Sequence, residues 1–179
     1  DMPYNTYRNS KEALKNAKLV MKKTKCDAVK LEGGKKIIPI VKSLIKNKIP
    51  VMGHLGILPQ TEKKFSFKGK RLAERNRILK DAQLLEKAGI FSVVLECVEM
   101  KLSKTITKTL KVPTIGIGAS AYCDGQVLVT DDLIGLGENK FRFVKKFANT
   151  SKLINSAVKK YKSEVIKRKF PKAKHSFKN

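Results

Sequence analysis

The chain has no tryptophan, only three cysteines and few acidic side chains. Cys26, Cys97 and Cys123 are too few and too widely spaced for a disulfide framework or a paired-cysteine metal site. Cys26 and Cys97 lie in apolar runs, where a cysteine usually packs as a small hydrophobe, so a reducing cytoplasm fits best. No apolar run is long enough to span a membrane and no leader pattern opens the chain, so we expect neither a membrane helix nor a signal peptide.

The shortage of acidic residues makes the chain strongly basic, with 40 Lys and Arg against 15 Asp and Glu and a formal net charge of +25. Such a charge is common among nucleic-acid-binding proteins. However, only six of the basic residues are arginine, and the lysines are spread over every segment, most densely over 140–178. We therefore favour a solvated lysine-rich surface and keep a basic nucleic-acid-binding protein as an alternative.

Apolar spacing predicts an alternation of strands and helices. We predict helices from a Ser10 cap to residue 25, through Ile37, Val41 and Ile45, and over 72–88, 100–110 and 151–168. Strands are predicted at 27–32, 50–54, 91–96, 113–118 and 126–130. Each short strand precedes a segment of helical length, which favours βα units and a parallel sheet. The prediction is one domain over 1–179 that ends in a basic tail at 170–179.

Four of the apolar runs end abruptly in polar or glycine residues. They are VKLEGG at 29–34, VMGH at 51–54, VVLEC at 93–97 and IGIG at 115–118. In a parallel α/β barrel the catalytic groups lie at the carboxyl ends of the strands, so these run ends predict an active site. The chain of 179 residues is short for such a barrel, which typically needs about 250 residues.

Charged residues at these run ends allow two interpretations each. Lys30 and Glu32 are two residues apart on one strand and therefore project from the same face. Spacing alone is equally consistent with an internal salt bridge and with a ligand site. Glu96 could bond a loop or the following helix, or it could act as a catalytic base.

Weaker signals lie on the neighbouring segments. A histidine after an apolar strand is usually structural, but Gly53 and Gly56 on either side of His54 suggest the close approach of a ligand. Asp131 and Asp132 are expected to cap the next helical turn. The longest connection, 55–71, has the composition of a functional loop and carries a basic cluster: Lys63, Lys64, Lys68, Lys70 and Arg71.

Taken together, six strings resemble the ketopantoate hydroxymethyltransferase family in order and approximate spacing. They are VKLEGG at 29–34, VMGHLGILPQ at 51–60, VVLECV at 93–98, IGIG at 115–118, CDGQVLV at 123–129 and KHSF at 174–177. The resemblance implies a magnesium-dependent (β/α)8 TIM barrel. Asp1 to Tyr4 resembles the segment that closes the third barrel strand of the family, so we expect an N-terminally truncated, incomplete barrel.

The resemblance also implies the reaction and the residues that carry it. The family transfers a hydroxymethyl group from 5,10-methylenetetrahydrofolate to 3-methyl-2-oxobutanoate, giving 2-dehydropantoate by way of an enolate stabilised by Mg²⁺. Asp1 and Glu32 are the implied metal ligands, Asp1 and Lys30 the implied substrate contacts, and Glu96 the implied proton acceptor. We expect His54 to line the substrate pocket, and the basic loop to attract the glutamyl carboxylates of the folate.

A homo-oligomer of the decamer type is expected from the resemblance as well. Two alternatives to the transferase stay open from the sequence. One is a related barrel enzyme that uses a magnesium-bound enolate for other carbon–carbon or carbon–phosphorus chemistry without folate. The other is a protein without catalytic activity, either a remnant of such an enzyme or the basic nucleic-acid-binding protein considered above.

Overall fold

The structure is a computed structural model that describes residues 1–62, 66–137 and 141–177. Contacts divide the chain into two compact units, residues 1–127 and 128–179. The prediction of one domain over 1–179 stays a prediction. Among the described residues, none of the helices has both the length and the apolar character needed to cross a bilayer.

The first unit alternates helices and strands, as the apolar spacing predicts. Its elements are α1 (Ser10–Thr24), β1 (Val29–Glu32), the 3₁₀ helix η1 (Lys35–Ile37), α2 (Ile38–Lys46), β2 (Val51–Gly56), α3 (Leu72–Lys87), β3 (Ser92–Glu96), α4 (Met100–Thr109), β4 (Thr114–Ile117) and β5 (Gly125–Gln126). The second unit contains α5 (Thr130–Leu133), α6 (Thr150–Ile166) and the 3₁₀ helix η2 (Ala173–His175).

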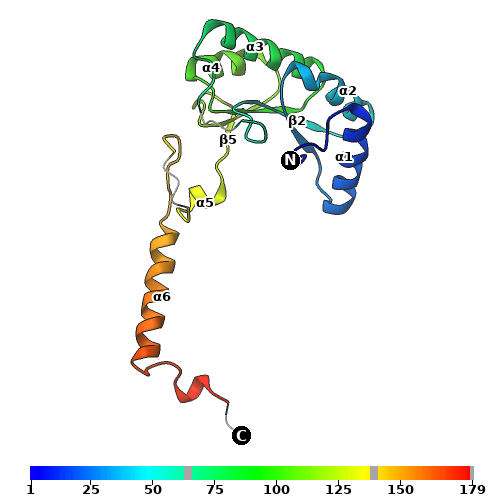
Figure 1. Ribbon diagram of the computed structural model, residues 1–179. Coiled ribbons are helices and arrows are strands. Elements are labelled where there is room, and N and C mark those ends of the chain that lie inside the picture. The colour runs from blue at the N-terminus through cyan, green and yellow to red at the C-terminus, as the bar shows by residue number, and fades with distance from the viewer. Residues whose placement is uncertain (63–65, 138–140, 178–179) are drawn as a thin grey trace. The chain divides into compact units, whose positions relative to one another are not determined.

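The five strands form one parallel sheet in the order β1-β2-β3-β4-β5. Figure 1 shows the helices of this unit arranged around the outer face of the sheet. A doubly wound sheet would reverse its strand order at a switch point and carry helices on both faces. Sequential order with one helical layer is consistent with a TIM-barrel-like fold. The predicted α/β class with a parallel sheet is confirmed. Barrel closure and the truncation stay predictions.

The two faces of the sheet differ in chemistry. Leu31, Gly53 and Val93 lie side by side toward the helices, and an added methyl group at Gly53 would be only 3.2 Å from Leu85 of α3. Glycine therefore allows α3 to pack closely on β2. On the other face Glu32 and His54 are aligned in the β1–β2 register. This inner face is the one that a barrel encloses, and it carries the charged groups.

Some predicted element ends are wrong, for local reasons. Asn9 caps α1 instead of Ser10, because its backbone is extended and its side chain accepts a hydrogen bond from Glu12 N at 2.9 Å. Strand β2 does not end at His54 but continues to Gly56, which pairs with Glu96.

The predicted strand 126–130 is also wrong beyond its first residue. Only Gly125–Gln126 pairs with β4, and Thr130 already begins α5. Asp131 and Asp132 lie within the first turn of α5, and Val129 occupies the cap position. Their predicted capping role is therefore wrong, although the predicted helical turn is present.

Candidate active site

The inner face of the sheet carries four ionisable side chains near the carboxyl ends of adjacent strands. Lys30 and Glu32 project from the same face of β1, as predicted, and His54 and Glu96 follow on β2 and β3. Their side chains are 22%, 7%, 3% and 15% exposed. Charges interact strongly in such a shielded environment, because little water is present to screen them.

His54 lies between the charged groups of β1 and that of β3. Its Nδ1 atom is 3.1 Å from Lys30 Nζ and 3.9 Å from Glu32 Oε1. Its Nε2 atom is 3.2 Å from Glu96 Oε2, but the two groups are not aligned for a hydrogen bond. Within the part of the chain that the structure describes, Nε2 is therefore a buried polar atom whose hydrogen bond is not made.

The contact with Lys30 determines the tautomer of the neutral imidazole ring of His54. An ammonium group can only donate hydrogen bonds, so Nδ1 must accept and carries no proton. In the neutral ring the proton is then on Nε2, which faces Glu96. A buried N–H without an acceptor costs about 1–3 kcal/mol, so the site favours any ligand oxygen or carboxylate rotation that supplies an acceptor.

Lys30 connects this cluster to the start of the chain. Its Nζ atom lies 2.7 Å from Asp1 Oδ1, and Asp1 is 58% exposed. Burial lowers the pKa of Lys30, while the negative charges of Glu32 and Glu96 raise it and only partly offset the burial. The direct ion pair of Lys30 is with Asp1 and not with Glu32. The ligand site that spacing also allowed stays a prediction.

Close backbone contacts position Glu96. Its carbonyl oxygen accepts a hydrogen bond from Ile57 N at 2.9 Å, and a methyl group on Gly56 would lie only 2.0 Å from that oxygen. The next residue, Cys97, has a positive φ of 50° and a buried thiol. Burial, together with the charge of Glu96, raises the pKa of the Cys97 thiol to about 11, so this thiol is protonated at neutral pH.

Comparison with known proteins decides the family. A family model described as ketopantoate hydroxymethyltransferase matches residues 1–173. The chain belongs to this family. The 3-methyl-2-oxobutanoate hydroxymethyltransferase of Pelagibacter ubique is 69% identical over 177 residues, which cover 99% of this chain and 69% of the relative. Those of Syntrophomonas wolfei and Heliobacterium modesticaldum are each 46% identical, over 99% of this chain and 66% of the relative. The chain thus spans about two thirds of the length of these relatives.

The chemistry of the carboxylates suits the hard cation that the family resemblance implies. No group of three or more histidine, cysteine, aspartate or glutamate side chains in the described residues is arranged to hold a metal. Mg²⁺ needs only one or two protein carboxylates, because water and substrate oxygens complete its octahedron. Asp1 lies beside β1 because Met2 N donates to Lys30 O at 3.0 Å, and Glu32 ends the same strand. This donor set fits Mg²⁺.

Gln60 is a structural residue of the site that sequence reasoning missed. Its backbone N–H donates to Glu32 Oε2 at 3.2 Å, and its side-chain amide donates to Met2 O at 2.9 Å. The hydroxyl of Tyr7 donates to the amide oxygen of Gln60 at 2.9 Å. Gln60 therefore holds the first residues of the chain and the Glu32 carboxylate together. The only sequence signal is its position in the VMGHLGILPQ string at 51–60.

The glycines near the site serve packing within the chain. Gly53 and Gly56 were expected to make room for a ligand, but their nearest neighbours are Leu85 and the Glu96 backbone respectively. Gly116 of the IGIG segment likewise faces Gln126 at 2.9 Å from an added methyl group. Packing within the chain therefore accounts for both glycines, and the approach of a ligand near them stays a prediction.

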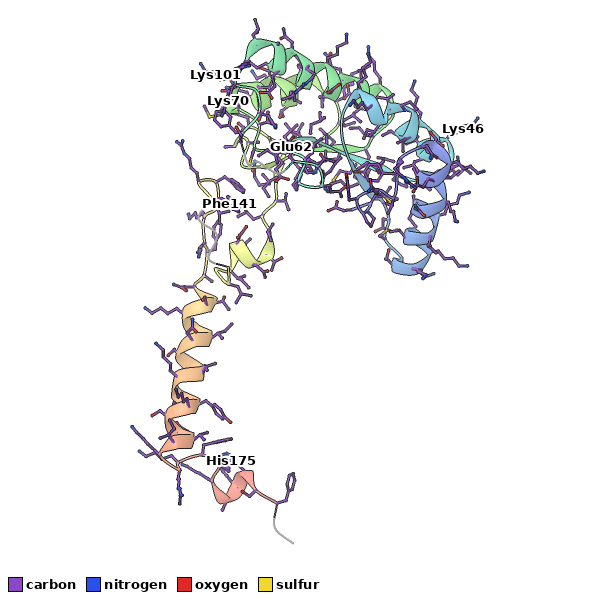
Figure 2. The ribbon with its side chains drawn as sticks, viewed as in Figure 1. Lys46, Glu62, Lys70, Lys101, Phe141 and His175 are labelled. Carbon is purple, nitrogen blue, oxygen red and sulfur yellow. The ribbon has the colours of Figure 1, made fainter. Side chains whose placement is uncertain are left out.

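The structure brings Asp1, Lys30, Glu32, His54 and Glu96 into one connected set of contacts. Their roles in metal binding, substrate binding and proton transfer stay predictions. Of the basic loop, Lys63 and Lys64 lie outside the described residues. His175 (Figure 2) lies in the second unit. The centroid of its ring is 5.2 Å from that of the Phe170 ring, and its Nδ1 atom accepts a hydrogen bond from Lys172 N.

Proposed function

We propose that this protein transfers a hydroxymethyl group from 5,10-methylenetetrahydrofolate to 3-methyl-2-oxobutanoate and forms 2-dehydropantoate, a step of pantothenate and coenzyme A synthesis. Membership of a hydroxymethyltransferase family supports the reaction class. The single observation that carries the proposal is the chain of contacts Lys30–His54–Glu96, shielded from water at the carboxyl edge of a parallel sheet.

Glu96 is the proposed proton acceptor. To form the new carbon–carbon bond, the carbon next to the ketone must first lose a proton, which requires a base within reach. The Glu96 carboxylate lies at a strand end, is 15% exposed and has a fixed backbone. The Nε2 atom of His54 lies 3.2 Å from one of its oxygens without a hydrogen bond between them, and a rotation of the carboxylate would supply the acceptor that Nε2–H lacks.

Lys30 is the proposed contact for the substrate carboxylate. In the structure it pairs with the carboxylate of Asp1 at 2.7 Å, so an ionised carboxyl group is already accepted at this point. A 2-oxoacid bound there would have its reacting carbon directed into the shielded face toward Glu96. His54, in contact with both Lys30 and Glu96, would set the distance between the two ends of the substrate.

Asp1 and Glu32 are the residues that would hold Mg²⁺. When bound, the cation polarises the substrate ketone and so favours loss of the adjacent proton. Glu32 keeps Oε1 available, because Oε2 already accepts a hydrogen bond from Gln60 N. Asp1 likewise uses Oδ1 toward Lys30 and keeps its second oxygen for the metal.

We further propose a homo-oligomer of the decamer type that works in the cytoplasm. The proposal of assembly is supported by α6, which buries none of its side chains within the described chain. The cytoplasmic proposal is supported by three free cysteines, Cys26, Cys97 and Cys123. Light scattering of the purified protein at micromolar concentration would determine the assembly state.

The test is product formation from 3-methyl-2-oxobutanoate with and without methylenetetrahydrofolate and Mg²⁺. We expect formation of 2-dehydropantoate that needs both, and a fall in kcat of about 10²–10⁴-fold in Glu96→Gln. Asp27→Asn is the matched control, because Asp27 is an exposed carboxylate just before β1, away from the strand's carboxyl end. Carbon–carbon bond chemistry without folate would favour the related barrel enzymes, and unchanged activity in Glu96→Gln would refute the proposed base.

A further inference from the structure

A recess lies on the connection between β2 and α3 and includes part of the basic cluster predicted from the sequence. It encloses about 540 Å³, which is within the range of small-molecule sites. We call it the loop pocket and define it by six of its lining residues: Phe67, Lys68, Lys70, Arg71, Glu74 and Arg77. Lys70 and, beside the pocket, Glu62 are labelled in Figure 2.

The loop pocket lies, like Glu96, at the carboxyl ends of the strands. Lys68 N donates to Cys97 O at 2.8 Å, and Glu99 N donates to Lys68 O at 2.9 Å. Gly69 follows with a positive φ of 88°, and a methyl group there would lie 2.8 Å from Leu102. These contacts fix the loop against the residues that come directly after Glu96, the proposed base.

The pocket lining is mainly cationic. Four of its six defining residues are Lys or Arg, and Glu74 is the one carboxylate among them. Lys68 pairs with Glu62, and Arg77 lies 3.7 Å from Glu74 with its side chain 68% exposed. Lys70 contacts the Ser66 hydroxyl and sits 4.5 Å above the Phe67 ring. Lys70, Arg71 and Arg77 therefore present positive charge to solvent in the recess.

Two backbone donors in the loop just before α3 are already used. Glu74 Oε2 accepts hydrogen bonds from Gly69 N at 2.7 Å and from Lys70 N at 3.3 Å. Gly69 N and Lys70 N are therefore not free to bind an anion in the pocket. What the loop pocket offers instead is several separate side-chain cations beside an exposed aromatic ring, since Phe67 is 50% exposed. This combination suits an aryl group followed by spaced carboxylates.

We propose that the loop pocket binds the aminobenzoyl-glutamyl tail of the folate donor, with Lys70, Arg71 and Arg77 contacting successive carboxylates and Phe67 packing on the aryl ring. The inference rests on the proposed function for the identity of the donor. It narrows the broader expectation from sequence, because Lys68 is engaged by Glu62. Arg77 of α3, which lies outside the predicted cluster, joins the site.

A direct binding measurement tests this without catalysis. The probe is 4-aminobenzoyl-tri-γ-glutamate, which lacks the pterin ring, titrated into the full chain by calorimetry. We expect saturable binding that weakens about tenfold in the triple variant Lys70→Gln, Arg71→Gln, Arg77→Gln, because each exposed ion pair contributes modestly. Binding should also weaken as salt is raised through the range where the screening length falls below about 10 Å.

Two comparisons keep the inference falsifiable. Lys80→Gln removes an exposed cation of α3 that does not line the pocket, and it should leave the dissociation constant unchanged. Circular dichroism of the triple variant must match the wild type, which the exposed positions of these side chains lead us to expect. Equal losses in Lys80→Gln and in the triple variant, or equal competition by inorganic phosphate at matched ionic strength, would mean general attraction of anions and would overturn the proposal.

Kinetics then separate this inference from the proposed function. With methylenetetrahydrofolate carrying one or several glutamates, the triple variant should raise KM for the long-tailed donor about tenfold and for the short-tailed donor less, with kcat unchanged. Transfer activity with no dependence on the tail would refute the loop pocket alone. Binding of the tail probe without any transfer activity would refute the proposed function alone.

Discussion

Gly56 gives the sharpest test of how the fold positions the proposed base. A methyl group at Gly56 would lie 2.0 Å from the Glu96 carbonyl oxygen. A carbon–oxygen contact of this kind is ordinarily no shorter than about 3.3 Å, so in Gly56→Ala the two strands must separate by roughly 1.3 Å at this point. The Ile57–Glu96 hydrogen bond of 2.9 Å bridges the same two strands and would be strained or lost.

The expected loss of stability has two parts. A side chain at a φ of +103° is strained, which costs on the order of 1–3 kcal/mol. Loss of the Ile57–Glu96 hydrogen bond adds about 1 kcal/mol. A displacement of about 1 Å at a catalytic group can lower a rate by about a hundredfold, so we expect a similar fall in kcat.

Gly89→Ala is the matched control. Gly89 has a similar φ of +98°, but the nearest atom to an added methyl group is the flexible end of Ile45 at 3.2 Å. Urea unfolding should report the strain cost in both variants, while the transfer assay should show a large loss of kcat in Gly56→Ala only. Equal kcat values in the two variants would refute the claim that Gly56 positions Glu96.

Three further predictions concern single side chains. Burial raises the pKa of Glu99, but hydrogen bonds from Lys101 N and Leu102 N and the charge of Arg75 outweigh it and lower the pKa below its usual 4.5. The contribution of Glu99 to folding stability is present above pH 4.5 and is lost as pH falls through the lowered pKa. The difference in Tm between wild type and Glu99→Gln should therefore be largest near pH 7. A difference in Tm that does not change with pH would contradict this. Because the pKa of Cys97 is about 11, iodoacetamide at pH 8 should alkylate the more accessible Cys26 first, and equal labelling by peptide mass mapping would argue against a buried Cys97. Lys30→Met should raise KM for the 2-oxoacid about tenfold to a hundredfold, as expected for loss of a charged hydrogen bond; an unchanged KM would remove Lys30 from the substrate site.

Local sequence patterns predict the elements and part of the site. The spacing of Lys30 and Glu32 predicts their shared face, because side chains on a strand alternate with a period of two. The position of Glu96 at the end of an apolar run predicts its place at the carboxyl end of a strand. Both features depend on residues that are neighbours in the sequence, which is why periodicity can detect them.

Contacts between strands are not contained in such patterns. The link from Lys30 through His54 to Glu96 depends on the register of three strands that are joined by long connections. Gln60 reaches Met2 across 58 positions of sequence, and no local spacing signals that contact. The amphipathic pattern of α6 correctly predicts a helix, but it cannot tell which surface covers the apolar face.

The central claim is that Glu96 removes the proton next to the ketone of the substrate. The most direct measurement is the exchange of the C3 hydrogen of 3-methyl-2-oxobutanoate with D₂O, followed by NMR in the presence of Mg²⁺ and without folate. The account predicts exchange catalysed by the wild type and by Asp27→Asn, and a loss of about a hundredfold or more in Glu96→Gln. Exchange at the wild-type rate in Glu96→Gln, or no exchange with the wild type, would contradict it.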